Sequence, residues 1–510
     1  MRPPFLLSLL LLLSFLSLRS QNVTITPNGI TPAPSHPRLT YDALLALPNP
    51  TEGDIAYDLT FKCLRVFNGN KWVCTLTNNP TLTPAIAAIA AVGSTETDYG
   101  FGIAVDANGN VYITGVYTGT AMFGTTSMTS VGNQDIFLAK YNGVGTLQWV
   151  RSAGGPNNDQ GLSVAVNAAG NVYITGYYNV TASFGTASVS ATGNNDIFVA
   201  QYDTDGNFQW VRSAGGMEED MGRGIAVDAA GNAFLTGHFR LTATFDGNSV
   251  ASIGGEDIFI AKYDNVGSLQ WVYSAGSSGD DRGMGITTDV SGNMYITGYY
   301  LSTITLGASS LTSSGGYDVF TAKYNSDGAV QWAQTIGGAG HEYGQSIAVG
   351  VNGNVAITGG FQGLTSFNGT TLNSEGIRDM FILKYNNAGG FLWVKSAGGT
   401  GYDHGYSVFV DADDFTYVAG CFEATAKFGT ITKTATGSQD LFVAKYNGGG
   451  GALQWVVPAG GSGSDLAMGI AIDTNTNIYL TGSYHNTAIF GNTPLTSVGN
   501  SDIFVGRLEK

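Results

Sequence analysis

The chain has 510 residues, of which 73 are glycine and 13 are proline, and 11% are aromatic. This composition favours many short strands joined by tight turns, and the apolar content of 43% excludes a disordered chain. The formal net charge is −16, from 38 acidic and 22 basic residues, so a polyanion is repelled on average and we expect no nucleic-acid partner.

The first 20 residues have the pattern of a secretory signal peptide. Arg2 supplies a positive charge, residues 5–18 form an apolar stretch, and cleavage is expected after Ser20. That stretch is short for a membrane span, and no later run reaches about 18 apolar residues. We therefore expect a secreted or cell-envelope protein without a transmembrane segment.

Residues 21–84 differ in composition from the rest of the chain. The stretch 21–37 is rich in proline and is predicted to be a linker. Residues 38–84 are predicted to form a small β-hairpin module, because apolar and polar residues alternate on both sides of an Asn-Gly turn. Cys63 and Cys74 flank that turn, and in an exported protein they form either a disulfide, which we favour, or two buried thiols.

Residues 85–510 are built from copies of one repeated sequence motif. The motif begins at Gly102 and reads Gly-Ile-Ala-Val-Asp-Ala-Asn-Gly-Asn-Val-Tyr-Ile-Thr-Gly. Edited copies begin at Ser163, Gly224, Gly285, Ser346, Ser407 and Gly469, at intervals of 61 residues and of 62 before the last. A fixed period of this kind indicates units that bury their faces against their neighbours.

Each period contains four strand signals, which in the second copy lie at 163–167, 171–178, 196–202 and 208–214. Alternating β-branched and aromatic residues, with glycines at the turns between them, predict an antiparallel meander. Four strands repeated seven times predict an all-β fold, a seven-bladed β-propeller, whose ring leaves only short, protected edges.

The ends of the repeat region predict how the ring closes. Six copies carry a Trp-bearing fourth strand: Trp149, Trp210, Trp271, Trp332, Trp393 and Trp455. The seventh copy has none, but residues 86–92 stand one period ahead of 147–153 and form an apolar run. We expect 86–92 to be the fourth strand of the last blade, because an open solenoid needs polar capping repeats.

Two motifs carry a resemblance to a known family. They are [Gly/Ser]-Ile-Ala-Val-Asp-Ala-x-Gly-Asn-Val-Tyr-Ile-Thr-Gly and Asp-Ile-Phe-Val-Ala-Lys-Tyr-[Asn/Asp]-x-x-Gly-x-Leu-Gln-Trp. Residues 85–510 resemble the bacterial SBBP β-propeller repeat family, which implies an exported or surface-associated propeller without fixing an activity. The module at 38–84 resembles a short head module of bacterial surface proteins.

Two rows of acidic residues recur in every copy. Asp135 and its equivalents open the third strand and are predicted to accept backbone hydrogen bonds at a turn. The second row stands just before the first strand, which lines the channel of a propeller: Asp98, Asp159, Asp220, Asp281, Glu342, Asp403 and Asp465. These acids either cap turns or form an electronegative channel mouth that binds a cation, for which calcium is the candidate, or a polyhydroxyl ligand. Crowding of like charges is expected to raise some of their pKa values.

Specificity is expected where an otherwise constant repeat varies. The residue after each acid of the second row changes from copy to copy: Tyr99, Gln160, Met221, Arg282, Tyr343, His404 and Leu466. The residue two further on also changes: Phe101, Leu162, Arg223, Met284, Gln345, Tyr406 and Met468. Because their neighbours hardly vary, we expect both rows to face the channel or its mouth. The candidate ligand-binding residues among them are Tyr99, Gln160, Met221, Arg223, Arg282, Tyr343, His404 and Tyr406.

The fourth to sixth copies suggest a second interpretation. There Asp281, Arg282, His341, Glu342, Tyr343, Asp403 and His404 gather in sequence. A histidine beside carboxylates is suited to acid–base work, so Glu342 and His404 are the candidate catalytic residues. Cys421, which stands alone in the sixth copy, is predicted to be a buried thiol.

The connection between the second and third strands is long and rich in serine and threonine. It carries a repeated apolar residue that is predicted to pack: Phe123, Phe184, Phe245, Leu306, Phe367, Phe428 and Phe490. Its polar remainder is expected to lie on the same face as the acids. The leading hypothesis is therefore a non-enzymatic exported scaffold that binds a protein or glycan at the cell surface. The alternatives are a lyase or hydrolase acting at the channel mouth, and a spacer without a specific ligand.

Overall fold

The computed structural model describes residues 84–509 without a gap and, before them, 23–26, 29–32, 38–39, 43, 46–48, 50–51, 54–58, 63–67 and 72–74. The chain divides into two compact units, residues 1–84 with 509–510, and residues 85–508. All elements of the described residues are β-strands. None of these residues belongs to a helix long and apolar enough to cross a bilayer. The predicted signal peptide, 1–20, lies outside the described residues.

The first unit contains two small sheets. The stretch predicted to be a linker carries a two-stranded antiparallel sheet of β1 (Val23–Thr26) and β2 (Gly29–Pro32). The second sheet has the order β3 (Arg38–Leu39), β4 (Ile55–Asp58), β5 (Cys63–Phe67) and β6 (Trp72–Cys74), with β5 and β6 as an antiparallel hairpin. The side chains of Cys63 and Cys74 lie outside what the structure describes, so the disulfide remains a prediction.

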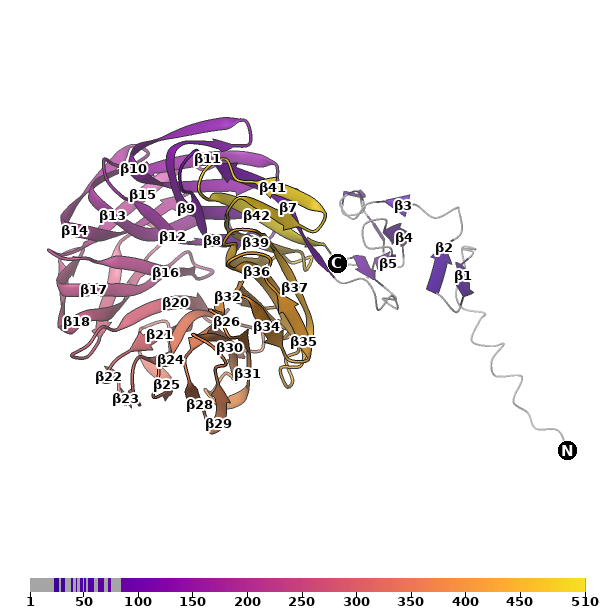
Figure 1. The fold of residues 1–510 in the computed structure, drawn as a ribbon. Coiled ribbons are helices and arrows are strands. Elements are labelled where there is room, and N and C mark those ends of the chain that lie inside the picture. The colour runs from indigo at the N-terminus through magenta and orange to yellow at the C-terminus, as the bar shows by residue number, and fades with distance from the viewer. Residues whose placement is uncertain are drawn as a thin grey trace. The chain divides into compact units, whose positions relative to one another are not determined.

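In the second unit each repeat folds as an antiparallel meander of four strands (Figure 1). The first strands are β8 (Tyr99–Val105), β12 (Gln160–Val166), β16 (Met221–Val227), β20 (Arg282–Thr288), β26 (Tyr343–Val349), β32 (His404–Val410) and β38 (Leu466–Ile472). The second strands are β9 (Val111–Phe123), β13 (Val172–Phe184), β17 (Ala233–Phe245), β21 (Met294–Tyr300), β27 (Val355–Phe361), β33 (Thr416–Phe422) and β39 (Ile478–Tyr484). The second strands form where apolar β-branched and aromatic residues are buried on the two faces of the sheet, whereas most residues of the first strands are half-buried.

The third and fourth strands complete each meander. The third strands are β10 (Thr126–Tyr141), β14 (Ala187–Tyr202), β18 (Asn248–Tyr263), β24 (Asp318–Tyr324), β30 (Asp379–Tyr385), β36 (Asp440–Tyr446) and β42 (Asp502–Glu509). The fourth strands are β11 (Leu147–Gly154), β15 (Phe208–Gly215), β19 (Leu269–Ala275), β25 (Val330–Gly338), β31 (Phe391–Gly399) and β37 (Leu453–Gly461). Each core combines two neighbouring repeats, as where Tyr173 and Ile197 pack with Ile225 and Phe239.

The long connection between the second and third strands forms a β-hairpin, where the sequence predicted a polar crown. In the first three copies the hairpin continues the long strands, such as β9 and β10. In the last four it consists of separate strands: β22 (Thr303–Leu306) and β23 (Ser309–Thr312), β28 (Leu364–Phe367) and β29 (Thr370–Asn373), β34 (Thr425–Phe428) and β35 (Ile431–Thr434), β40 (Thr487–Phe490) and β41 (Thr493–Thr496). In the second, third, fifth, sixth and seventh copies the hairpin pairs with the fourth strand of the preceding repeat, as in Ala153 with Phe184, whereas β22 and β23 of the fourth copy form a separate two-stranded sheet. Its repeated apolar residue is buried in every copy, which confirms the packing role.

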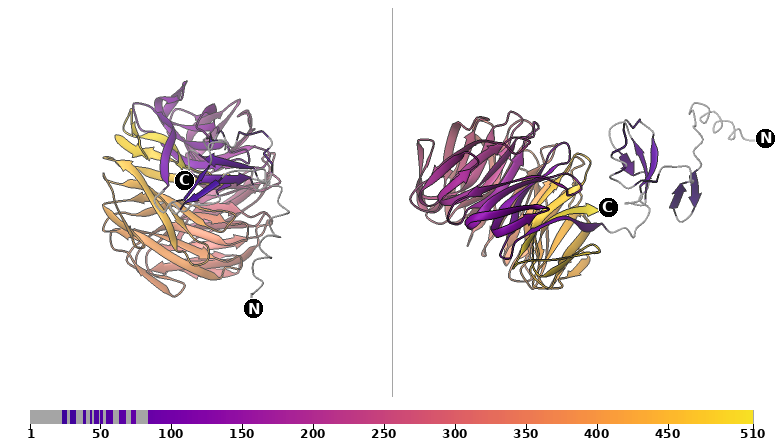
Figure 2. Two further views of the ribbon diagram at one scale, coloured as in Figure 1. Left: turned by 90° about the vertical axis from the view of Figure 1, so that its right-hand side faces the viewer. Right: turned by 90° about the horizontal axis from the view of Figure 1, so that it is seen from above.

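The start and the end of the repeat region lie side by side. Strand β7 (Ala85–Gly93) lies between β9 and β42 in the sheet, and Ile86 belongs to the core of the seventh repeat. The Asp98 N–H donates to the Ser501 carbonyl at 2.9 Å, and Arg507 Nη1 donates to the Gly143 carbonyl at 3.1 Å. Figure 2 shows the indigo and yellow ends of this unit adjoining. Each first strand contacts the first strand of the next repeat, and β38 contacts β8.

Candidate functional site

The row of acids before the first strands is buried between neighbouring repeats. Asp220 is fully buried; one oxygen accepts the Gly216 N–H at 2.6 Å and the other accepts the Arg240 N–H at 3.0 Å. The same two bonds, from a residue four positions earlier and one 20 positions later, recur at Asp98, Asp159, Asp281, Asp403 and Asp465. Glu342 differs only in taking its second bond from the Thr365 hydroxyl, at 2.9 Å.

Burial governs the protonation of these acids. It raises the pKa of Asp98, Asp159, Asp281 and Asp465 to about 6 and that of Asp220, Glu342 and Asp403 to about 7, because the charged form loses water, while the donated hydrogen bonds oppose the rise. Charge repulsion, which the sequence suggested as the cause, is a smaller contribution. For Asp159 it comes from Asp135.

A second buried acid lies beside each of the first. Asp135 opens the main part of the third strand and accepts the Val131 N–H at 2.9 Å. A glycine separates the two acids: a side chain at Gly154 would place its Cβ 2.8 Å from Asp135 Oδ1 and 3.1 Å from Asp159 Oδ2. The φ of Gly154 is 153°, which L side chains rarely adopt. The acids therefore hold neighbouring repeats together through backbone N–H groups.

This placement corrects the expectation of an acidic channel mouth. The carboxylates of the second row are buried, and both oxygens of each are occupied by protein donors, so they present no free ligands for a cation. Among the described residues, no group of three or more His, Cys, Asp or Glu side chains is arranged to hold a metal ion. The capping interpretation agrees with the hydrogen bonds, whereas the electronegative mouth does not.

The second variable row lines a central cavity of about 250 Å³. All seven members take part: Phe101, Leu162, Arg223, Met284, Gln345, Tyr406 and Met468. Each is the extra residue of a β-bulge in its first strand, as where Gly161 pairs with Gly176 and Ser163 with Thr175, which leaves Leu162 unpaired. A bulge bends the strand and redirects one side chain, so the bulges turn these residues toward the cavity.

The first variable row lies beside the cavity and contacts the preceding repeat. Its partner is the residue just before each third-strand acid: Gln134, Asn195, Glu256, Tyr317, Arg378, Gln439 and Ser501. Gln160 Nε2 donates to Gln134 Oε1 at 2.9 Å, Arg282 bonds Glu256, and the rings of Tyr317 and Tyr343 lie 5.8 Å apart. The sequence reasoning missed this partner row, although the same variability beside a constant acid marks it.

Four residues of the first variable row and its partner row, with Arg240 and Tyr402 in contact with these rows, form a surface that we call the variable wall: Arg240, Arg282, Tyr317, Tyr343, Arg378 and Tyr402. The Arg378 guanidinium lies over two tyrosines, 4.1 Å from the ring centre of Tyr343 and 5.1 Å from that of Tyr402. The remaining residues predicted to bind ligand lie nearby. Tyr99 stacks on Phe101 with 5.8 Å between ring centres, and Met221 Sδ lies 3.4 Å from Arg223.

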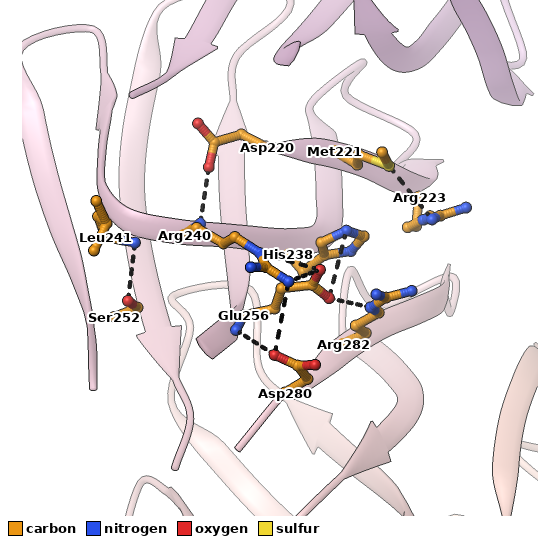
Figure 3. Close-up of polar contacts among 10 residues, drawn as sticks. All are labelled: Asp220, Met221, Arg223, His238, Arg240, Leu241, Ser252, Glu256, Asp280 and Arg282. Carbon is orange, nitrogen blue, oxygen red and sulfur yellow. Dashed lines mark hydrogen bonds and ion pairs between the residues drawn. The ribbon is translucent and has the colours of Figure 1, made fainter. Parts of the chain in front are cut away.

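A buried carboxylate holds the third and fourth copies together at the wall. Glu256 is 2% exposed; it bonds Arg282 and accepts from Arg240 Nη2 at 2.9 Å (Figure 3). Its backbone N–H donates to Asp280 at 3.0 Å. His238 Nε2 lies 3.9 Å from Glu256, but burial, reinforced by the neighbouring arginines, lowers the pKa of His238 well below its usual value, so the ring is neutral.

The candidate catalytic residues are not brought together. Glu342 is fully buried and bonded to Gly338 and Thr365. His404 is 3% exposed, with its ring 4.8 Å from that of Tyr406, and burial followed by the charge of Arg378 lowers its pKa to about 3. The two residues therefore have different neighbours and form no acid–base pair. Cys421 is a buried free thiol, as predicted, 4.0 Å from the Tyr406 hydroxyl.

Comparison with known proteins supports the repeat. The SBBP β-propeller repeat matches residues 92–116. The chain is 26% identical to the uncharacterized WD repeat-containing protein L264 of Acanthamoeba polyphaga mimivirus, over 70% of this chain and 33% of that protein. It is 25% identical to the regulatory protein FlaEY of Caulobacter vibrioides, over 68% of this chain and 39% of that protein. The chain thus covers less than half the length of either relative.

Solved structures show more distant similarity. The WD40 domain of Neurospora crassa Pan2 aligns with 83% of this chain and 95% of its own, at a TM-score of 0.38 and 9% identity. A protein of unknown function from Bacteroides caccae aligns with 57% of this chain and 80% of its own, at a TM-score of 0.33 and 12% identity.

Proposed function

Because the chain is a β-propeller repeat protein, we propose that residues 85–508 close into a seven-bladed propeller and serve as a non-enzymatic scaffold that binds a protein partner at the variable wall. Closure is supported by β7, which takes a place between β9 and β42, and by the contact between β38 and β8. The core that joins Val92 and Ile113 to Tyr479 and Val505 also links the first and last repeats.

The observation that carries the function is the chemistry of the wall. Arginine and tyrosine are enriched at the centres of protein interfaces, because they combine large contact areas with directed hydrogen bonds. The arginines and tyrosines of the wall come from four consecutive repeats, and they occupy positions whose side chain varies between repeats. Packing between repeats does not require arginine or tyrosine there, because other copies carry different side chains at the equivalent positions, such as Gln134 for Tyr317 and Gln160 for Tyr343.

Exposed apolar side chains at equivalent positions of three repeats favour a protein over a glycan. Val131, Ile253 and Val498 are 78%, 75% and 70% exposed. Their positions are equivalent, since the backbone N–H of each donates to the acid that follows four residues later. Large apolar residues at equivalent exposed positions around one end of the molecule are suited to burial against a protein.

Photo-cross-linking tests this proposal. A benzoylphenylalanine in place of Tyr317 is expected to give an adduct of defined mass with a protein partner in cells that make the full chain. The control position is Val290, 92% exposed, which lies in the turn at the other end of β20. Adducts from both positions would indicate unspecific contact. Absence of adducts from both would favour the spacer, and a glycan partner would instead appear as wall-dependent retention on a glycan array.

We also propose that the protein is exported and acts at the cell surface or envelope. The proposal rests on the signal-peptide pattern of residues 1–20 and on the cysteine pair at 63 and 74. Fractionation with N-terminal sequencing of the mature protein tests it. An intact N-terminus in the cytoplasmic fraction would contradict it.

A further inference from the structure

The central cavity combines an apolar wall with a few polar groups. Four of its seven bulge residues are apolar, namely Phe101, Leu162, Met284 and Met468. The other three are Arg223, Gln345 and Tyr406. Sites for small molecules commonly have this composition, in which apolar side chains supply contact area and few polar groups fix the orientation.

Arg223 is the cation of this cavity, and its charge has no carboxylate partner. Its Nη2 lies 3.4 Å from Met221 Sδ, and its Nε is buried without a hydrogen-bond acceptor. The nearest acid of the cluster, Glu256, is already engaged by Arg240 and Arg282, and Figure 3 shows Arg223 lying apart from it. Among the described residues, Arg223 forms no ion pair within 4.0 Å.

Arg223 is the guanidinium of the surrounding cluster that has no ion pair in the described part of the chain. Arg240 and Arg282 are paired with Glu256, Arg240 is also attracted by Asp280 and Glu219, and His238 is neutral. Burial and the neighbouring Arg282 lower the pKa of Arg223, which means that the charged form of its side chain is destabilised. Arginine nevertheless stays protonated in proteins, and a partly buried cation without a counter-charge is unfavourable. An anion in the cavity would remove that penalty.

We propose that this cavity binds a small organic carboxylate with an apolar body, with Arg223 holding the carboxylate. A planar guanidinium matches a carboxylate by two parallel hydrogen bonds, and Phe101, Leu162, Met284 and Met468 provide the surface for the apolar part. A single free cation suits a monoanion. A phosphate or sulfate dianion is disfavoured, because Arg240 and Arg282 are already neutralised by Glu256 and Asp280.

The inference deepens the proposed function, because it rests on the closed ring that brings the seven bulges together, but it does not depend on the protein partner. The test uses calorimetry on the full chain with 4-phenylbutyrate, the uncharged 4-phenylbutanol and inorganic sulfate as probes. We expect saturable binding of 4-phenylbutyrate that is tighter than that of the alcohol or of sulfate.

The variant Arg223→Met keeps the length and apolar stem of the side chain and removes the charge. It is expected to weaken 4-phenylbutyrate binding by about 10- to 100-fold, which corresponds to the loss of a charge-assisted hydrogen bond, and to leave the alcohol unaffected. It is also expected to unfold at a higher temperature than the parent, because a partly buried cation without an ion pair is gone. The matched control Arg212→Met removes an arginine that donates to the Val266 carbonyl elsewhere, at 3.2 Å, and is expected to bind 4-phenylbutyrate normally.

Three results would overturn the inference: no saturable binding of 4-phenylbutyrate by the parent at millimolar concentration, equal binding by Arg223→Met, or tighter binding of sulfate. If Arg223→Met fails to fold, Arg223→Lys and Arg223→Gln decide, since only the former retains the charge and should bind. Cross-linking at Tyr317 reports separately on the partner. If the parent does not bind 4-phenylbutyrate but the Tyr317 adduct forms, only the cavity ligand is rejected. If the parent binds 4-phenylbutyrate but no adduct forms, only the protein partner is rejected.

Discussion

Asp281 and Arg282 are adjacent in the chain, yet Asp281 belongs to a row that is acidic in every repeat and Arg282 to a row whose side chain varies between repeats. Asp281 is one of seven acids buried between repeats, and all seven make equivalent hydrogen bonds to protein donors. Arg282 belongs to the variable wall, at a position where the seven copies carry six different side chains. The contrast shows that the acid repeated in every copy joins neighbouring repeats by hydrogen bonds, while the position next to it is not needed for that role.

The interfaces between repeats are expected to respond to pH. The buried acids have pKa values of about 6 to 7 in the folded chain, against ordinary values of 3.8 for aspartate and 4.5 for glutamate. Between about pH 4 and 7 the folded state therefore holds more protons than the unfolded state, so its free energy of unfolding falls as the pH rises. Denaturant titrations are expected to give lower stability at pH 8 than at pH 5.

This pH effect has the opposite sign to that of acids stabilised in their charged form. Acids whose folded pKa lies below the ordinary value would make the protein more stable at pH 8 than at pH 5. A rise in stability over that interval would therefore show that the donated N–H groups outweigh burial.

Removing one interface acid is expected to have the largest effect of any single substitution. In Asp220→Ala two N–H groups, of Gly216 and Arg240, lose their acceptor in a buried place, and we expect a loss of about 2–5 kcal/mol in the free energy of unfolding. The exposed Asp205, changed to alanine, serves as the control and should stay within about 0.5 kcal/mol of the parent.

The same substitution at Asp98 tests whether the junction of the first and last repeats resembles the other interfaces between repeats. Asp98 lies at the junction of the first and last repeats, where it accepts the Ser94 N–H at 2.6 Å and the Thr118 N–H at 2.9 Å. If the ring is closed, Asp98→Ala should cost as much as Asp220→Ala by chemical denaturation. A much smaller loss would mean that this junction opens and does not behave as the other interfaces do.

A wall substitution is expected to cost less. Glu256→Gln leaves Arg240 and Arg282 with a neutral partner; because the two side chains are 40% and 29% exposed, water compensates in part. We expect a loss of about 1–3 kcal/mol by the same measurement. The matched change Gln134→Ala breaks the neutral equivalent of this contact and should cost less than about 1 kcal/mol. Equal losses would show that the charges at Glu256 add nothing.

Removal of divalent cations is expected to have the smallest effect. Both oxygens of each acid in the second row accept protein hydrogen bonds, so calcium has no open ligands there. The unfolding midpoint should be the same in chelator and in millimolar calcium, measured by differential scanning calorimetry. A rise with calcium would indicate an occupied cation site.

Much of the fold was predictable from the repeat. The period of 61 residues, the Trp-bearing strands and the buried Phe123 row are local patterns, since the same packing recurs in every copy for the Phe123 row and in six copies for the tryptophan. The position of Leu162 was recognisable in the sequence because its side chain varies between repeats. The structure explains this variation, since a residue left out of the strand pairing escapes the constraint on its neighbours. The partner row at Glu256 was missed, since its contact is with the next repeat, 26 residues later, at Arg282.

The strands, the repeat and the positions where copies differ are evident from the amino-acid sequence alone, because strand pairing and turn chemistry act between residues close in the chain. The burial of the acids and the position of Arg223 at a cavity depend instead on how the repeats pack. Solvent exposure depends on which surfaces of two repeats meet, and no spacing within one repeat specifies that. The charge that a ligand would encounter therefore differs in sign from the net charge of −16 that the composition gives.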